Sequence, residues 1–325
     1  MINVLKPGLH TTIQDFGRVG YYEIGMPPSG ALDKYSYSVA NLLVGNDPKA
    51  AVLEITYMGP ELEFKENTLI AITGGEIPPK INRESVPMYE TLKINAGDVL
   101  SFDFLKNGAR VYLSVAGGID VPEIMSSRST YTLSKIGGIN GRALKEGDTL
   151  FIGNLKNKSI KEGVKLPPEL ITEFSNTHEL RIIEGLYNHR ITQESRERFF
   201  EIEWTVTPDA NRVGYRLKGE RLNFVPRKQP YGAGSNPSNV VDVGYPIGSI
   251  QIPDGIEPII LLNDAVTSGG YATVGTVISA DLDVLAQAKT HDKLKFISIS
   301  MGEALQVRKE QNKRIEMIEE FIYKH

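Results

Sequence analysis

The sequence contains no cysteine in its 325 residues. This absence excludes disulfide bonds, thiolate metal sites and a cysteine nucleophile, and it fits a reducing compartment. The five histidines lack the spacing of metal ligands, so we expect no metal site; they are His10, His178, His189, His291 and His325.

Long apolar runs and an excess of charge are also missing. No segment approaches the roughly 20 apolar residues of a membrane helix, and the first residues lack the basic and apolar regions of a signal peptide. The net charge of -4 provides no basic field for nucleic acid or an anionic membrane. We therefore expect a cytoplasmic protein that binds neither nucleic acid nor membrane.

Three common catalytic signatures do not occur. The chain has no GxxxxGK[ST] motif, no GxGxxG opening a βαβ unit and no GxSxG motif. A nucleotide, if bound, is therefore not held by a P-loop, and a hydrolytic reaction does not use an elbow serine. No lysine stands in a recognisable biotin-carrier context.

The most informative segment that is present runs from Ile13 to Asn46. Its first part, up to Gly30, carries four glycines, a proline pair and one charge pair, Asp15 and Arg18. Residues 31–43 have the apolar periodicity of a helix, which Ser29 or Asp33 can cap. Long glycine-rich loops within compact domains are usually functional.

Elsewhere the pattern is mostly β. Short β-type runs separated by turn clusters at near-regular spacing indicate a barrel or sandwich. Residues 153–168 are rich in lysine and asparagine and end in a proline pair, so we place the boundary between two β domains there, giving domains 1–165 and 166–325. Residues 302–325 predict a C-terminal helix packed on the second domain.

The first candidate binding group is Gln14, Asp15 and Arg18. Glycines allow backbone N–H groups to approach a ligand, and an arginine binds a carboxylate or phosphate bidentately. The alternative is an Asp15–Arg18 pair that only fixes the loop. Ser29 has no histidine or lysine near it in sequence to act as a base, so a capping role is favoured over a nucleophilic one.

Further arginines and glycines form a second candidate group. Arg128 lies among hydroxyls and Arg142 follows several glycines, the ingredients of an anion cradle. The alternative is a pair of turns with surface arginines. Arg212 is a candidate ligand-binding residue, whereas we expect Arg216 to be solvated.

The densest group of polar residues is in the second half. Asp264 follows an apolar run and precedes Thr267, Gly269, Gly270 and Tyr271. A carboxylate at a strand end can position a hydroxyl or water for attack. Gln251 adds another polar side chain. The alternative is a turn capped by Asp264.

The ordered motifs resemble those of the allophanate hydrolase subunit 2/KipA family, whose carboxyltransferase-like module also occurs in urea carboxylases. The motifs are QDFGRVG, PPSGALD, SSRSTY, GGINGR, NRVGYR, IQIP and D-x-x-TSGGY. The resemblance implies two tandem cyclophilin-like β-barrel domains with a few short helices. It also places eleven of the candidate residues on family motif positions: Gln14, Asp15, Arg18, Arg128, Arg142, Arg212, Gln251, Asp264, Thr267, Gly270 and Tyr271.

The functional expectation follows from this resemblance. The chain is expected to be the C component of an ATP-dependent 5-oxoprolinase, inactive alone, with a KipI-like B component and a LamB/YcsF-like A component. Asp264, Arg18 and Gln251 would act in catalysis, the other candidates would bind substrate, and Mg would accompany the ATP. The alternatives are a regulator that binds a KipI-like kinase inhibitor and a biotin-dependent carboxyltransferase. One departure from the expected pattern is the turn Thr290–Asp292, which has histidine where glycine is expected.

Overall fold

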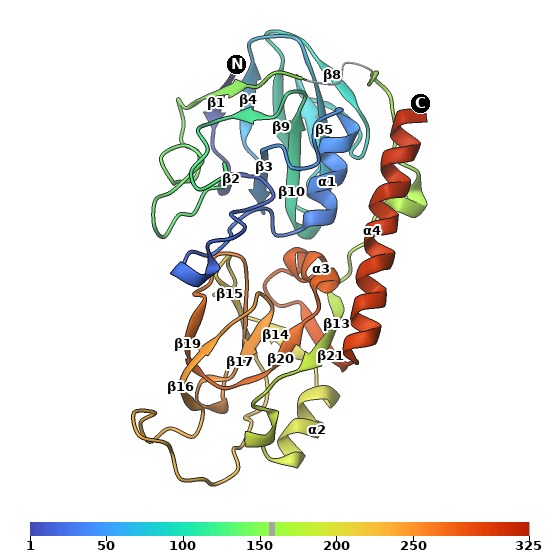
Figure 1. Cartoon of the computed structure of the whole chain (residues 1–325). Helices are drawn as coiled ribbons and strands as arrows, with labels where there is room; N and C mark the ends of the chain where they lie inside the picture. The colour runs from blue at the N-terminus through green and yellow to red at the C-terminus, as the bar shows by residue number, and fades with distance from the viewer. Residues whose placement is uncertain (156–159, 325) are drawn as a thin grey trace. The chain divides into compact units, whose positions relative to one another are not determined.

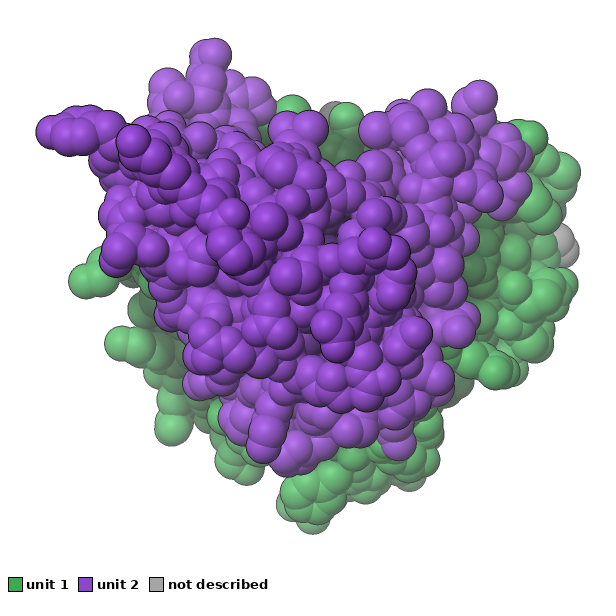
Figure 2. Space-filling view, turned by 90° about the horizontal axis from the view of Figure 1, so that it is seen from below, with its two compact units in different colours: residues 1–19, 29–174, 311–325 green, residues 20–28, 175–310 purple. Residues whose placement is uncertain are grey.

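The computed structural model describes residues 1–155 and 160–324. The chain forms two compact units, coloured in Figure 2. Unit 1 comprises residues 1–19, 29–174 and 311–325, and unit 2 comprises residues 20–28 and 175–310. Each unit therefore includes a segment distant in sequence from its main part, a feature that composition alone does not reveal.

Unit 1 contains two antiparallel sheets. The first has the order β11 (Ile119–Asp120), β12 (Thr149–Ile152), β1 (Ile2–Lys6), β4 (Glu61–Phe64), β9 (Val99–Phe102), β6 (Pro79–Ile81) and β7 (Glu84–Ser85). The second has the order β2 (His10–Gln14), β3 (Val52–Thr56), β10 (Asn107–Val115), β5 (Thr68–Glu76) and β8 (Leu92–Ile94).

Alternate side chains from both sheets bury one apolar core. Ile2 and Val4 of β1 join Leu53 and Ile55 of β3, because residues two apart on a strand point to the same face. Val111, Leu113 and Val115 of β10 continue the same pattern. The period-2 pattern thus accounts for the core of this unit.

Two helices cover an outer face of unit 1 (Figure 1). Helix α1 (Lys34–Leu43) begins at Asp33, whose carboxylate accepts a hydrogen bond from the Ser36 N–H at 2.8 Å. Its apolar side packs against β5 and β10. Ile318 and Ile322 of α4 (Met301–Lys324) join the same apolar cluster.

The C-terminal helix is confirmed, but it does not belong to the second domain alone, as predicted: only residues 301–310 of it belong to unit 2. Residues 311–325 belong to unit 1. The physical reason is that α1 presents Leu42 and Leu43 to a cluster that the helix completes with Ile318 and Ile322, four residues apart on one face. Its start is fixed by a reciprocal capping box between Ser300 and Glu303.

Unit 2 contains a closed barrel. Its order is β13 (Thr177–Glu184), β20 (Thr273–Val277), β17 (Ser249–Gln251), β18 (Ile259–Leu261), β15 (Gly214–Lys218), β14 (Trp204–Val206) and β21 (Lys293–Ser298). A separate ribbon pairs β16 (Asn239–Gly244) with β19 (Ser268–Tyr271). The prediction of a mostly β chain with a few helices is confirmed.

The helices of unit 2 are short. Helix α2 (Gln193–Glu201) is capped by Thr192, whose hydroxyl accepts from the Ser195 N–H at 3.3 Å, and α3 (Leu282–Gln287) follows β20. In both units together, short 3-10 turns lie at Tyr22–Ile24, Pro168–Leu170, Asn188–Arg190, Pro253–Gly255 and Ser279–Asp281. No helix among the described residues is long and apolar enough to cross a membrane.

The histidine at residue 291 occupies a glycine-type conformation. Three strand-entry turns share one design, in which an aspartate accepts the N–H three residues earlier: Asp98 from Asn95, Asp148 from Lys145 and Asp292 from Lys289. The residue before each aspartate has positive φ: +93° at Gly97, +85° at Gly147 and +75° at His291. The expectation of a glycine-like turn is therefore met by a histidine in the left-handed region.

Candidate functional site

Asp15 is the centre of a buried hydrogen-bond cluster in unit 1. Its carboxylate accepts from the Gly17 N–H at 2.8 Å, the Ser127 hydroxyl at 2.7 Å and the Arg128 N–H at 2.5 Å. The Ser129 hydroxyl donates to it as well. The SSRS segment therefore does surround an anion, and that anion is the chain's own Asp15.

Arg18 lies close to this cluster and contacts the same 124–129 segment. Its guanidinium donates to the main-chain oxygens of Ile124, at 3.2 Å, and Ser129. The side chain is only 1% exposed. Asp15 and Arg18 therefore each connect their loop to the 124–129 segment. A ligand-binding role for Arg18 stays a prediction.

Gln14 is the last residue of β2 and is fully buried. Its amide donates to the Thr12 hydroxyl at 2.9 Å and to the Thr130 carbonyl at 3.2 Å. These bonds join β2 to the segment that surrounds Asp15. In this structure Gln14 therefore fixes the 124–130 segment to the end of β2.

The two arginines of the predicted anion cradle bind different partners. Arg128 is half-buried, and its side chain donates to Glu123 and to the Val121 carbonyl. Arg142 forms a bidentate pair with Asp148, at 2.7 and 2.8 Å. This pairing raises the pKa of Arg142 and lowers that of Asp148, in each case through the hydrogen bond between them.

A polar cavity of about 830 Å³ adjoins the Asp15 loop. Asp15 and Gly17 line it together with Asp47, Asp120 and Arg128. Both neighbouring glycine N–H groups are engaged, that of Gly117 with Asn46 and that of Gly118 with Val115. The lining therefore mixes acidic side chains with the basic Lys49 and Arg128, and the N–H groups of Gly117 and Gly118 are already used within the protein and not offered to a phosphate.

Ser29 does not cap α1, because Asp33 does. Ser29 has a φ of +53°, is 1% exposed, and its hydroxyl lacks a hydrogen-bond partner among the described residues. Both features oppose folding, since a left-handed non-glycine residue costs about 1–2 kcal/mol and an unsatisfied buried polar group about 1–3 kcal/mol.

We therefore expect Ser29→Gly to raise the free energy of unfolding by about 1–2 kcal/mol, after subtracting the greater entropy of glycine in the unfolded chain. Urea denaturation of wild type and variant measures this change in the free energy of unfolding. Ser29→Ala is the matched control, because it removes the hydroxyl and keeps the strained backbone, so its gain should be smaller. A Ser29→Gly variant less stable than wild type would contradict this account.

In unit 2, Arg212 and Asp264 form a buried ion pair. Arg212 Nε lies 2.9 Å from Asp264 Oδ2, and Nη2 lies 3.2 Å from Oδ1. The residues are 7% and 2% exposed. The Asp264 N–H also donates to the Arg212 carbonyl at 3.1 Å. The two predicted residues are thus brought together from segments 52 positions apart.

The other predicted residues of unit 2 gather around Tyr245. Its hydroxyl donates to the Tyr271 carbonyl at 2.8 Å and accepts from the Tyr271 N–H at 2.6 Å. Its main-chain N–H donates to the carbonyl of Thr267 at 2.8 Å. Gly269 lies against the Tyr245 ring, where a Cβ would come within 2.7 Å. Thr267, Gly269, Gly270 and Tyr271 therefore form one segment shaped by a buried tyrosine.

Gln251 ends β17 and faces Thr273 of β20 in register. Thr273 lies two residues after Tyr271, so Gln251 stands near the end of the Tyr245-supported segment. The predicted residues therefore form two groups, one in each unit. Gln14, Asp15, Arg18 and Arg128 meet in unit 1, and Arg212 and Asp264 meet in unit 2, while Arg142 stays within its own turn.

Comparison with known proteins identifies the family. The family model of the carboxyltransferase domain, subdomain A and B, matches residues 24–298. The chain belongs to the carboxyltransferase domain family. Within this family, the match includes both Arg212 and Asp264 and begins after Asp15 and Arg18.

Relatives in this carboxyltransferase domain family differ in length. The urea amidolyase of Saccharomyces cerevisiae is 38% identical over 325 residues, covering 98% of this chain but 18% of that protein. The C component of the Escherichia coli 5-oxoprolinase is 35% identical over 319 residues, covering 98% of this chain and 97% of that protein. The crystal structure of the K. lactis urea amidolyase superposes with a TM-score of 0.92 at 37% identity, over 98% of this chain and 20% of that one. The chain thus spans about a fifth of the urea amidolyases.

Sequence patterns missed a second buried charged group in this carboxyltransferase domain. Glu54 of β3 accepts from the Leu32 N–H and the Tyr112 hydroxyl, both at 2.9 Å, and lies 3.9 Å from Arg110. Tyr112 in turn accepts from the Asp33 N–H, so the group supports the start of α1. A single charge inside the apolar run 51–55 was the available signal, because a buried strand rarely carries an unpaired charge.

Proposed function

We propose that this chain is the C component of an ATP-dependent 5-oxoprolinase complex. In this proposal the complex opens the lactam of 5-oxo-L-proline to L-glutamate, with a KipI-like B component and an A component of the LamB/YcsF-like type. The supporting observation is the extent of similarity to proteins named as the C component of 5-oxoprolinase. The chain aligns with 97% of the E. coli protein and 99% of the Haemophilus influenzae protein.

The chemistry of this reaction fits an enzyme built from several different chains. A five-membered lactam is a comparatively stable amide, so phosphorylation of its oxygen by ATP is a reasonable route to hydrolysis. Such a route requires cations that bind carboxylate or phosphoryl oxygens and dipoles that stabilise developing charge. Arginines of this chain would supply part of that environment, and Mg would accompany the ATP.

The geometry refines the role proposed for Asp264. Both of its carboxylate oxygens already accept from Arg212. We infer that the pair acts as a unit in which Asp264 holds the guanidinium in one orientation. Asp264 is then a positioning residue for Arg212, and the pair together would contribute to the charged environment of the reaction.

A second candidate function is carboxyl transfer in a biotin-dependent, urea carboxylase-type system. It is favoured by the 38% identity to a yeast urea amidolyase and by the TM-score of 0.92 to the K. lactis enzyme. In such a system a biotin carrier, loaded by a biotin carboxylase, would deliver the carboxyl group.

The test is reconstitution. We expect this chain, co-purified with the KipI-like and LamB/YcsF-like components, to release glutamate from 5-oxoproline in an ATP-dependent reaction, and expect no release when this chain is omitted. A parallel assay supplies biotinylated carrier, bicarbonate, ATP and urea with a biotin carboxylase. Activity only in the second assay would overturn the 5-oxoprolinase proposal in favour of carboxyl transfer. Stable binding to the KipI-like component without either activity would favour the regulatory role.

A further inference from the structure

Two arginines of unit 2, Arg190 and Arg227, are half-buried and yet have no carboxylate partner among the described residues. Most arginines that form ion pairs in this unit bind an acid in bidentate fashion, as Arg181 does with Asp281 and Arg196 with Glu184. Arg190 and Arg227 instead contact only neutral groups.

The backbone holds these two arginines near each other. The Val225 N–H donates to the Arg190 carbonyl at 2.8 Å, and Ile191 forms a bridge with Phe224. Arg227 follows Val225 by two residues. The positive charge of Arg227, added to the larger effect of burial, lowers the pKa of Arg190. Two like charges are therefore kept close together without an acid between them.

Arg190 is positioned firmly. Its Nη1 donates to the Asn239 carbonyl at 3.0 Å, and its guanidinium carbon lies 4.5 Å from the centre of the Tyr187 ring. Its Nε is buried and lacks a hydrogen-bond partner among the described residues. A buried N–H donor left unsatisfied is destabilising and in native structures usually marks a missing partner.

Arg227 is held from the other side by Gln229. Its Nε and Nη2 both donate to Gln229 Oε1, at 3.2 and 2.5 Å, and the Gln229 amide donates to the Asn236 carbonyl. A neutral amide oxygen orients the guanidinium without cancelling its charge. The local arrangement therefore leaves two positive charges uncompensated, whereas a carboxylate in place of Gln229 would neutralise one of them.

We propose that Arg190 and Arg227 form a binding site for an anionic group, the carboxylate or phosphoryl group of a small molecule. The planar fork of a guanidinium matches the oxygens of either group, and two such forks can engage one anion from two sides. The site adjoins the predicted Thr267–Tyr271 segment, since Asn239, which accepts from Arg190, pairs with Tyr271 in the β16–β19 ribbon.

The alternative is a solvated basic loop with no ligand. Such a loop is expected to leave each arginine in water, hydrogen bonded on every face. The buried Nε of Arg190 and its stacking on Tyr187 differ from that expectation. The proposal does not depend on which reaction the assembled complex performs, because the ligand is defined by its charge.

The test is binding to the 325-residue chain at low ionic strength, by calorimetry, with inorganic phosphate, ATP and 5-oxoproline as separate probes. We expect Arg190→Gln and Arg227→Gln each to weaken the affinity for whichever anion binds by about 10- to 100-fold. This is the effect of losing hydrogen bonds to a charged group. Arg221→Gln is the matched control. Arg221 is an exposed arginine of the same unit, and its removal changes the net charge equally.

Competition separates the two sources of the anion. Phosphate and ATP that compete for one site, while 5-oxoproline does not displace them, identify a phosphoryl site. Binding of 5-oxoproline that phosphate does not displace identifies a carboxylate site. Without ligand, Arg227→Gln should melt at the same or a higher temperature, because repulsion between the two guanidiniums is relieved. The proposal is overturned if none of the three probes binds saturably. It is also overturned if both variants bind within twofold of wild type or if Arg227→Gln is markedly less stable.

Discussion

Replacing Asp264 with asparagine is expected to lower the free energy of unfolding by about 3–5 kcal/mol, because it removes the charged partner from a buried, bidentate ion pair with Arg212. The carboxylate is 2% exposed and accepts from two nitrogens of the guanidinium. Urea denaturation with an unchanged slope between wild type and variant gives the difference directly.

The double variant Arg212→Met/Asp264→Leu separates structure from chemistry. Removing both charges and keeping the volume is expected to recover most of the lost stability, since well-packed apolar replacements of buried ion pairs are often neutral or stabilising. Glu257→Gln is the control: Glu257 pairs with Arg216 at the surface, where both side chains are about 40% exposed. Its effect should stay below about 1 kcal/mol.

The double variant also tests the functional proposal. If it folds and binds the KipI-like component but the complex no longer releases glutamate, the pair is required for the reaction. If the complex keeps full activity, Arg212 and Asp264 are structural. A loss of less than about 1 kcal/mol in Asp264→Asn would instead contradict the burial of an ionised pair.

Replacing Asp15 with alanine is expected to destabilise the chain by about 3–5 kcal/mol, because four donors lose a charged acceptor inside the protein. The donors are two main-chain N–H groups and two serine hydroxyls. The measurement is urea denaturation, combined with hydrogen exchange at the Gly17 and Arg128 amides. Both amides should exchange faster than in wild type even where the chain remains folded.

Asp120→Ala is the matched control for Asp15→Ala. Asp120 lines the same cavity and is exposed. Its replacement should change stability by no more than about 0.5 kcal/mol, the usual range for surface sites. If Asp15→Ala behaved like this control, the hydrogen-bond cluster would contribute nothing to stability. If Asp15→Ala destabilised the chain without affecting amide exchange in residues 124–130, Asp15 would stabilise a part of the protein other than this segment.

Local sequence patterns predicted several elements correctly for simple reasons. The apolar periodicity of residues 31–43 became α1, and the helix expected in residues 302–325 became α4. These features depend on neighbours a few residues apart, and the chain carries that information in its pattern.

Other strands had no such signal. The strands β16, β17 and β19 are short and contain polar or glycine residues. Their pairing depends on partners far away in sequence, as in the match of Asn239 with Tyr271. The shape of β19 also depends on Tyr245, whose hydroxyl bonds to both main-chain groups of Tyr271. No local pattern reports such a contact.

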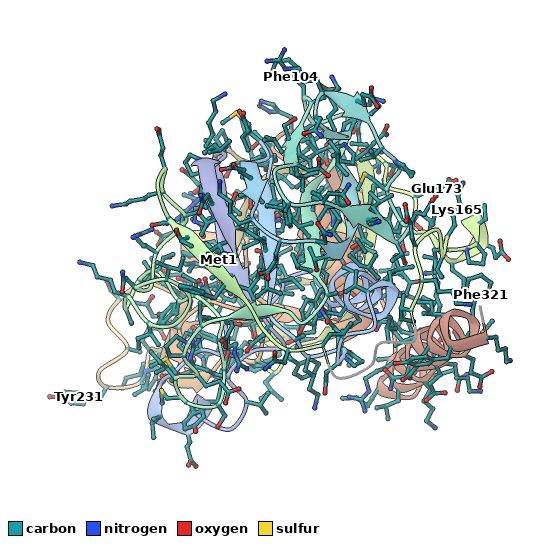
Figure 3. All side chains as sticks on the ribbon, turned by 90° about the horizontal axis from the view of Figure 1, so that it is seen from above. Met1, Phe104, Lys165, Glu173, Tyr231 and Phe321 are labelled. Atoms are coloured by element: carbon teal, nitrogen blue, oxygen red, sulfur yellow. The ribbon has the colours of Figure 1, made fainter. Side chains whose placement is uncertain are left out.

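The candidate residues show the same division (Figure 3 shows all the side chains on the ribbon). Asp15, Arg18, Arg212 and Asp264 were identified as unusual charges among glycines or at a strand end, but their partners were not. Asp15 and Arg18 are close in sequence, whereas in the structure Asp15 accepts hydrogen bonds from residues more than 110 positions away. Arg190 and Arg227 gave no local signal, because their significance lies in being close together without an acid.

By itself, the sequence determined the β-rich character of the chain, the helices with periodic apolar faces and, through its ordered motifs, the family. Those properties follow from short-range periodicity and from motif order. Only the tertiary structure decided that the C-terminal helix completes unit 1, that Asp15 is the anion of its own cradle and that Arg212 pairs with Asp264. Each of these depends on burial and on contacts between distant segments, because removal from water makes an unpaired charge or polar group costly.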